Sequence, residues 1–274
     1  MACLGEFGFA QLFKFSQKKG YSAPVVFSTN YVTMAIALGV FHLCGSGFDM
    51  TTATVRVGMI TGTVFVCSMF IMTTALRLLS VAPVLTAFRL AVVIPVILSV
   101  QIWGEQISLL QAAGIGSALI ALGLMARGAP AITHTSTRIS LCLIPLVFCA
   151  QGLSNSCLRW VHYAGLDNVL LSVLFFVGAT AGTLGSIAVL LCSGKPTRQE
   201  LQMGAIIGLL NLMALVVILL ALRQIPGTVF FPAVGCTVVV MDQLSAHFIW
   251  KEPVTVPARW GALLAVVAMF LVLR

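Results

Sequence analysis

Three ionisable side chains lie inside long apolar stretches of the sequence: Glu6, Arg89 and Asp242. A charged residue within the hydrocarbon of a bilayer costs roughly 2.5–3.5 kcal/mol on insertion scales, so each of the three is a candidate functional group. Glu6 lies about 11 residues, or ~16 Å along a helix, from the polar break that follows it, near the middle of a core about 30 Å thick. A carboxyl group at that depth is a candidate proton carrier; the alternative is a hydrated carboxylate at a membrane surface.

Arg89 and Asp242 fall at matching depths. Their stretches run in opposite directions, and each residue lies about eight or nine residues, or ~12–14 Å, from the same membrane face. Two such side chains can pair and both remain charged. One interpretation is a pair that opens during function, with Arg89 binding an anionic group and Asp242 a proton or cation. The other is a fixed bridge between two helices, and the sequence leaves both open.

Amide side chains accompany these charges. Asn30 and Asn211 fall in the same layer as the Arg89–Asp242 pair, and Gln11 shares the stretch of Glu6. Gln151 and Asn155 are four residues apart and therefore share one face of a helix. We expect these amides to line a polar cavity at mid-depth; the alternative is hydrogen bonding that joins neighbouring helices.

The sequence contains no pattern typical of catalysis. The H-E-x-x-H, G-x-S-x-G and P-loop patterns are absent, and the histidines and cysteines lack metal-binding spacing. An intramembrane aspartic protease would need a second aspartate within an apolar stretch, where Asp242 stands alone. We therefore expect no enzyme activity, no bound metal and no cofactor.

The elements that position these residues follow from composition. Of 274 residues, 60% are hydrophobic and 8% are charged, and the mean hydropathy is +1.10. A soluble domain has about 25% charged residues, so this composition excludes a soluble fold. Apolar runs of about 20 residues between short polar breaks predict transmembrane helices. The net charge of +8 comes from basic residues at the ends of these runs, which is typical of topology signals and not of nucleic-acid binding.

We predict ten transmembrane helices in an all-α polytopic membrane protein, at 1–17, 23–44, 57–76, 80–103, 107–126, 139–158, 168–192, 202–222, 226–250 and 257–273. The longest polar connection divides the chain into a first five-helix repeat (1–126), a connecting loop (127–138) and a second five-helix repeat (139–274). Nine basic residues fall on the side reached after the first span, and four fall on the other side. This excess predicts that the side with nine is cytoplasmic and that both termini are external.

The two halves are related in sequence. Gly58-Met59-Ile60-Thr61-Gly62 recurs as Gly204-Ala205-Ile206-Ile207-Gly208, and Ala75-Leu76-Arg77 recurs as Ala221-Leu222-Arg223, both 146 residues later. Trp103-Gly104-Glu105 recurs as Trp250-Lys251-Glu252 and Gly114 as Gly261, both 147 residues later. Because each unit has an odd number of spans, the second enters the membrane from the opposite side. This predicts inverted repeats, an architecture typical of alternating-access carriers; the alternative is duplication that only enlarged a helical bundle.

Pairs of glycines four residues apart predict close helix packing, with a hinge role as the alternative. The pairs are Gly58 and Gly62, Gly178 and Gly182, and Gly204 and Gly208. Two glutamates, Glu105 and Glu252, follow the fourth and ninth spans, where we expect turn or gate residues.

The chain resembles the drug/metabolite transporter superfamily, in its ten-helix EamA-like branch. The resemblance rests on an A-L-R helix end, a span ending in G-E or K-E, and a glycine-containing fifth span, in the segments ALRLLSVAPVLTAFRLAVVIPVILSVQIWGEQISLLQAAGIGSALIALGLM and ALRQIPGTVFFPAVGCTVVVMDQLSAHFIWKEPVTVPARWGALLAVVAMFLVL. It covers essentially the whole chain and implies a transporter fold without naming a substrate.

The first helix is similar to that of the small multidrug resistance proteins of the same superfamily. Leu4-Gly5-Glu6 is followed after seven residues by Lys14-Phe15-Ser16. The resemblance implies that Glu6 binds substrate and protons alternately. The aligned position in the second unit is Leu146, so a paired-carboxylate mechanism has no second carboxylate there.

Together these observations predict a secondary transporter of a small organic metabolite or drug-like solute, with proton-coupled export as the expected mechanism. The expected partners are that solute, protons and the lipid bilayer, in a monomer or homodimer of the bacterial inner membrane. The alternatives are an exchanger of phosphorylated or nucleotide-linked sugars, with Arg89 as the anion contact, or a non-transporting scaffold on the same fold.

Overall fold

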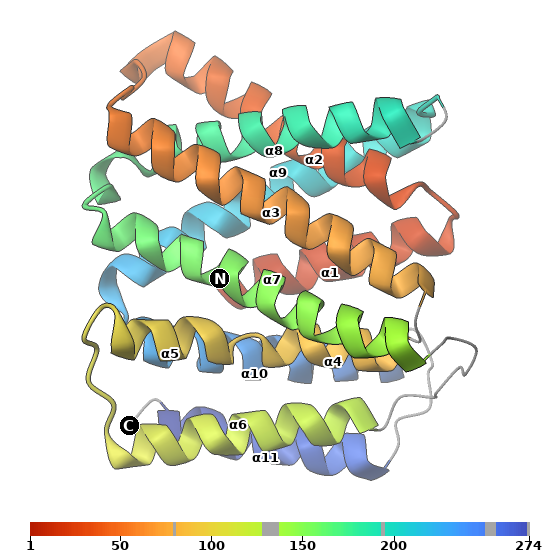
Figure 1. Cartoon of the computed structure of the whole chain (residues 1–274), viewed down its shortest axis with the longest axis vertical. Helices are drawn as coiled ribbons and strands as arrows, with labels where there is room; N and C mark the ends of the chain where they lie inside the picture. The colour runs from red at the N-terminus through yellow and green to blue at the C-terminus, as the bar shows by residue number, and fades with distance from the viewer. Residues whose placement is uncertain (79–80, 128–136, 193–194, 250–255, 273–274) are drawn as a thin grey trace. The chain divides into compact units, whose positions relative to one another are not determined.

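A computed structural model describes residues 1–78, 81–127, 137–192, 195–249 and 256–272. These residues form helices and no strand (Figure 1). The helices are α1 (Ala2–Lys18), α2 (Ala23–Phe41), α3 (Thr52–Leu78), α4 (Val81–Leu90), α5 (Val93–Gln101), α6 (Leu109–Arg127), α7 (Thr137–Tyr163), α8 (Leu170–Cys192), α9 (Arg198–Gln224), α10 (Gly227–Phe248) and α11 (Val256–Val272). A π-helical turn, His42–Ser46, extends α2, and a 3-10 turn, Asp167–Val169, precedes α8.

The described part of the chain contains four segments long and apolar enough to cross a membrane. They are Ala23–Gly45, Thr52–Leu76, Asp167–Leu191 and Arg198–Gln224. Shorter apolar helices accompany them, at Ala87–Gln101, Leu109–Ala121, Gly227–Asp242 and Arg259–Val272. The described part of the chain is thus all-helical, and four of its segments have the length and composition of membrane spans, as the apolar runs predicted.

The helices form two compact units. Unit 1 comprises 1–73 and 157–223, and unit 2 comprises 74–156 and 224–274. Each unit therefore combines helices from the two sequence halves. Most of the predicted connecting loop, 128–136, lies outside the described residues, as does Glu252.

In unit 1, α2 and α8 pack closely in antiparallel directions. A Cβ atom at Gly178 would lie 3.1 Å from the Ala35 amide nitrogen, and one at Gly182 would lie 2.9 Å from the Val32 amide nitrogen. Later residues of α8 therefore meet earlier residues of α2. Only a residue without a side chain permits this approach of the two backbones.

The other glycines of unit 1 reveal a repeated contact. A Cβ atom at Gly62 of α3 would lie 2.6 Å from the Val177 carbonyl oxygen of α8, and one at Gly208 of α9 would lie 2.6 Å from the Asn30 carbonyl oxygen of α2. Gly208 follows Gly62 by 146 residues, and Val177 follows Asn30 by 147. Helix α9 therefore packs on α2 as α3 packs on α8.

The preceding glycines make the same pair of contacts. A Cβ atom at Gly58 would lie 2.5 Å from the Phe176 Cβ, and one at Gly204 would lie 2.5 Å from the Thr29 Cβ. Phe176 follows Thr29 by 147 residues. The repeat seen in the sequence is thus also a repeat of helix–helix contacts within unit 1.

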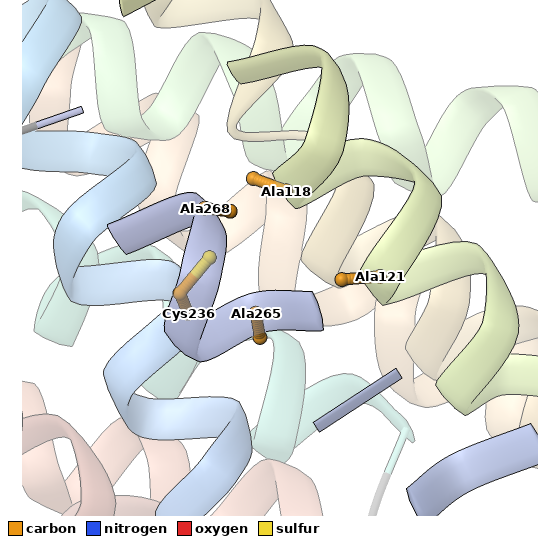
Figure 2. Packing of buried hydrophobic residues seen from close by; sticks show 5 residues of the cluster. All are labelled: Ala118, Ala121, Cys236, Ala265 and Ala268. Atoms are coloured by element: carbon orange, nitrogen blue, oxygen red, sulfur yellow. The ribbon is translucent and has the colours of Figure 1, made fainter. Parts of the chain in front are cut away.

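Unit 2 has a comparable antiparallel pair, α6 and α11. A Cβ atom at Gly114, near the start of α6, would lie 2.9 Å from the amide nitrogen of Val272 at the end of α11. Between them lies a buried cluster of small side chains, Ala118, Ala121, Ala265, Ala268 and Cys236 (Figure 2). Ala265 and Ala268 follow Ala118 and Ala121 by 147 residues, so the two helices contribute equivalent positions to one contact.

The stretch predicted as a span over 80–103 contains a break, because α4 ends at Leu90 and α5 begins at Val93. Pro95 has no N–H group with which to bond the Ala91 carbonyl four residues earlier. The Ile94 amide instead donates to the Ala91 carbonyl at 3.1 Å, which closes a tighter turn. The break places a short irregular segment directly after Arg89.

Candidate functional site

Arg89 and Asp242 form an ion pair in unit 2, as their equal depths predicted. The guanidinium Nη2 of Arg89, in the last turn of α4, donates to Oδ2 of Asp242 on α10. The two side chains are 24% and 27% exposed. A cation in the last turn of a helix is also stabilised by the helix dipole, so both the carboxylate and the end of α4 favour a charged Arg89.

Helix α10 is held to the α4–α5 segment at a second point. The Glu105 carboxylate accepts hydrogen bonds from the backbone amides of Gly227, at 3.1 Å, and Thr228, at 2.9 Å. These amides belong to the first turn of α10, where a helix lacks internal partners for its N–H groups and favours a negative charge. Glu105 therefore caps the start of α10. The capped residue Gly227 lies about 15 residues, or ~22 Å along the helix, before Asp242.

This arrangement defines what the site can do chemically. A partly exposed carboxylate paired with arginine can exchange its partner for a proton or a cation, and the released guanidinium can bind an anionic group in a fork of N–H donors. The break between α4 and α5 places irregular backbone beside the pair.

The amides on α7 and in unit 1 also come together in pairs. Gln151 Nε2 donates to Asn155 Oδ1 at 3.3 Å along one face of α7. In unit 1, Asn211 Nδ2 on α9 donates to Asn30 Oδ1 on α2 at 3.2 Å.

Asn30 is fully buried, at 0% exposure, and its Nδ2 donor has no partner among the described residues. A buried donor without a partner is uncommon in native proteins. The Asn30–Asn211 hydrogen bond joins α2 to α9.

Glu6 lies half-buried on α1 in unit 1. Its neighbour Gly5 packs on α9, since a Cβ atom there would lie 2.6 Å from the Ala214 Cβ. Asn211 precedes Ala214 by three residues on α9, so it lies on the turn of that helix next to this contact. Gln11 is also half-buried on α1. The structure therefore places Glu6, Gln11, Asn30 and Asn211 in unit 1, and Arg89, Asp242, Gln151 and Asn155 in unit 2.

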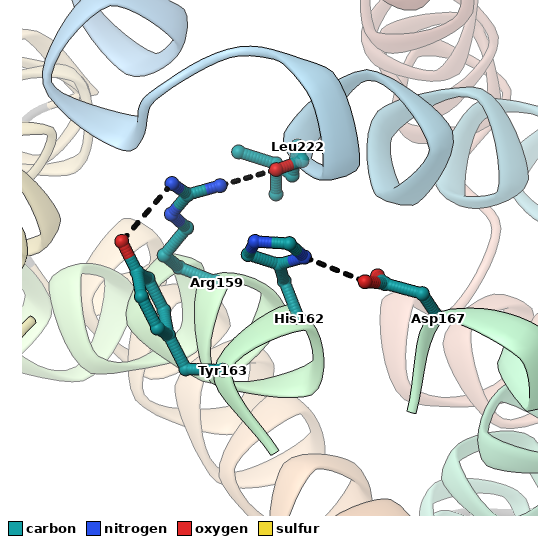
Figure 3. Close-up of polar contacts among 5 residues, drawn as sticks. All are labelled: Arg159, His162, Tyr163, Asp167 and Leu222. Carbon is teal, nitrogen blue, oxygen red and sulfur yellow. Dashed lines mark hydrogen bonds and ion pairs between the residues drawn. The ribbon is translucent and has the colours of Figure 1, made fainter. Parts of the chain in front are cut away.

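A polar cluster that was not predicted from the sequence lies at one end of unit 1 (Figure 3). Arg159 is 4% exposed and donates from Nη1 to the carbonyl of Leu222 in the last turn of α9. Its guanidinium also lies over the Tyr163 ring, 4.9 Å from the ring centre. His162 Nδ1 lies 2.7 Å from Asp167 Oδ2 across the turn between α7 and α8. From its position at a helix end, Arg159 was predicted to act only as a signal for membrane topology. In the structure, its guanidinium caps the C-terminal end of α9.

A second missed cluster lies at the other end of unit 1. The buried Glu200 carboxylate accepts hydrogen bonds from the Ser22 amide at 2.7 Å and the Thr197 amide at 2.8 Å, and from the Thr197 hydroxyl at 2.9 Å. The T-x-x-E spacing is the signature of a capping box and could have identified Thr197 and Glu200. The contact with Ser22 additionally fixes the α1–α2 turn to the start of α9.

The described residues form an all-helical fold with four segments long and apolar enough to span a membrane. No protein-family model and no curated protein matches the chain. Among solved structures, 28 chains match. One, described only as the crystal structure of a protein, superposes with a TM-score of 0.75 over 99% of this chain and 98% of its own, at 14% sequence identity. The two proteins are thus similar in fold.

Proposed function

We propose that this protein is a secondary transporter of the drug/metabolite type, which moves a small organic solute across a membrane by alternating access. The observation that carries the proposal is the repeated contact in unit 1, where Gly62 meets α8 and Gly208 meets α2 at the same 2.6 Å approach. Two equivalent interfaces can exchange tight and loose packing between the halves of a carrier, which is how inverted repeats produce inward-open and outward-open states.

The direction of the helices supports ten spans in two inverted repeats of five. Helices related by the 146–147-residue offset run parallel if a unit has an even number of spans and antiparallel if the number is odd. Two related pairs that pack together, α2 with α8 and α6 with α11, are antiparallel in their glycine contacts. The resemblance to the EamA-like branch of drug/metabolite transporters agrees with this topology.

Proton coupling through Glu6 and partner exchange at the Arg89–Asp242 pair complete the proposed mechanism. Protonation of Asp242 would release Arg89, and loss of that proton to the solvent would restore the pair. The half-exposure of both side chains supports access of protons or solute to them. We place the protein in the bacterial inner membrane as a monomer or homodimer, with proton-coupled export as the direction.

The test uses the purified full chain in liposomes with an imposed pH gradient and a panel of amino acids, cationic drugs and sugar phosphates. We expect proton-coupled flux of at least one class, lost in Glu6→Gln and in Asp242→Asn. Asp49→Asn is the matched control, since Asp49 lies between α2 and α3 and its Oδ1 accepts from the Thr51 amide, which an asparagine oxygen also allows. Flux unchanged in both test variants would refute the mechanism, and absence of flux with every class would favour a scaffold.

A further inference from the structure

Helices α2 and α8 enclose an open apolar groove of about 680 Å³. Its two walls are formed by equivalent positions, because lining positions of α2 correspond to lining positions of α8 147 residues later. Examples are Val32 and Ala179, Ile36 and Thr183, and Leu43 and Leu190. The Thr183 hydroxyl donates to the Ala179 carbonyl at 2.6 Å and so is satisfied within its own helix. The groove thus offers an occupant apolar contacts.

Basic residues flank both groove helices at one end. Lys18 and Lys19 precede α2, and Lys195 and Arg198 follow α8; all four are exposed. Because α2 and α8 are antiparallel, the start of the first and the end of the second lie at the same end of unit 1 (Figure 1).

Hydrogen bonds hold these basic segments together. The Ser22 amide, three residues after Lys19, donates to the Glu200 carboxylate at 2.7 Å. The Tyr21 hydroxyl donates to Gln199 Oε1 at 3.4 Å. Among the described residues at this end, Glu200 is the only acid, whereas Asp49 and Asp167 lie at the opposite ends of α2 and α8. The positive charge is therefore concentrated at this end of the groove helices.

We propose that this end of unit 1 binds an anionic phospholipid, with its acyl chains in the α2–α8 groove and its phosphate beside Lys19 and Arg198. A cluster of four Lys and Arg residues next to membrane spans attracts anionic headgroups. Leu190 is 81% exposed in the last turn of α8, five residues before Lys195, and connects the apolar wall to the basic residues. The proposal requires insertion in a membrane but not transport.

Charge also argues against a second copy of the chain as the occupant. A symmetric dimer through this groove, with its axis along the membrane normal, would place the same patch of both copies side by side. Two clusters containing Lys19 and Arg198 would then repel each other. A lipid phosphate instead neutralises them.

The experiment measures lipid retention on the purified full chain by native mass spectrometry, with dioleoyl phosphatidylglycerol or phosphatidylcholine titrated into detergent. We expect preferential retention of phosphatidylglycerol. Lys19→Ala with Arg198→Ala should lower its affinity by up to about 25-fold, from about 5-fold for each cation. Affinity for phosphatidylcholine should not change.

The matched control is Arg56→Ala with Arg223→Ala, which removes two exposed cations from the opposite end of unit 1 and should preserve the preference. Ala179→Phe narrows the groove and should weaken both lipids equally. Equal retention of the two lipids by the parent chain, or an equal loss of phosphatidylglycerol in the two charge variants, would overturn the proposal. Unchanged retention of both lipids in Ala179→Phe would refute the acyl-chain position.

Discussion

Asp242→Asn removes the carboxylate that neutralises Arg89 and so tests the central contact of unit 2. An exposed ion pair contributes about 0–1 kcal/mol, whereas removing one partner of a buried pair costs about 3–5 kcal/mol. With side chains 24% and 27% exposed, an intermediate loss of about 2 kcal/mol is expected. For a chain of this size that corresponds to a fall of roughly 4–8 °C in Tm.

The assay is a double-mutant cycle in one detergent. Arg89→Gln, Asp242→Asn and the double variant are compared with the parent by thermal unfolding. If the two side chains pair, the double variant loses little more than either single variant, with a coupling energy of about 2 kcal/mol. Losses that add to within about 0.5 kcal/mol would refute the pairing. Asp49→Asn serves as the control for loss of a carboxylate elsewhere.

Further variants test individual contacts by thermal unfolding. Gly208→Ala should destabilise the protein by about 1–3 kcal/mol, since the new Cβ atom would lie 2.6 Å from the Asn30 carbonyl oxygen. Gly123→Ala, which has open space around it, should stabilise the protein by up to about 1 kcal/mol. A Gly123→Ala variant less stable than Gly208→Ala would contradict the packing. Arg159→Met should cost about 2–4 kcal/mol by uncapping α9, and an unchanged Tm would show that the Leu222 carbonyl does not need its donor. Glu200→Gln should lower the free energy of unfolding by about 1–2 kcal/mol at neutral pH. The difference from the parent should shrink in acid, because Glu200 of the parent then becomes protonated. A difference that does not change with pH would exclude a charged cap.

Several structural features were predictable because they depend on local pattern. The apolar runs predicted the helices, and their ends differ from the predictions by a few residues. The glycine pairs predicted close packing, and each of Gly58, Gly62, Gly204 and Gly208 lies against another helix. Helical rise, fixed at about 1.5 Å per residue, predicted equal depths for Arg89 and Asp242, and the resemblance implied that their two helices face each other.

Other features required the tertiary structure. The position of Glu105 after the predicted fourth span indicated a turn. Its hydrogen bonds with the amides of Gly227 and Thr228, however, join residues more than a hundred positions apart. Pro95 was visible in the sequence, yet prolines also occur within continuous helices here, at Pro145 and Pro232. Whether a helix breaks at proline depends on what replaces the lost hydrogen bond, which local sequence does not specify.

By itself the sequence determined the all-helical class, the approximate positions of the helices, the 146–147-residue repeat and the spacing of each charged residue along its segment, since hydropathy and helical rise act along one segment at a time. The tertiary structure decided which helices share an interface, that α2 meets α8 and α6 meets α11 in antiparallel directions, and that Arg159 caps α9. These pairings depend on close approach and on unsatisfied carbonyl and amide groups of distant segments. Nearly every lipid-compatible helix is apolar all round, so its own pattern does not identify its neighbour.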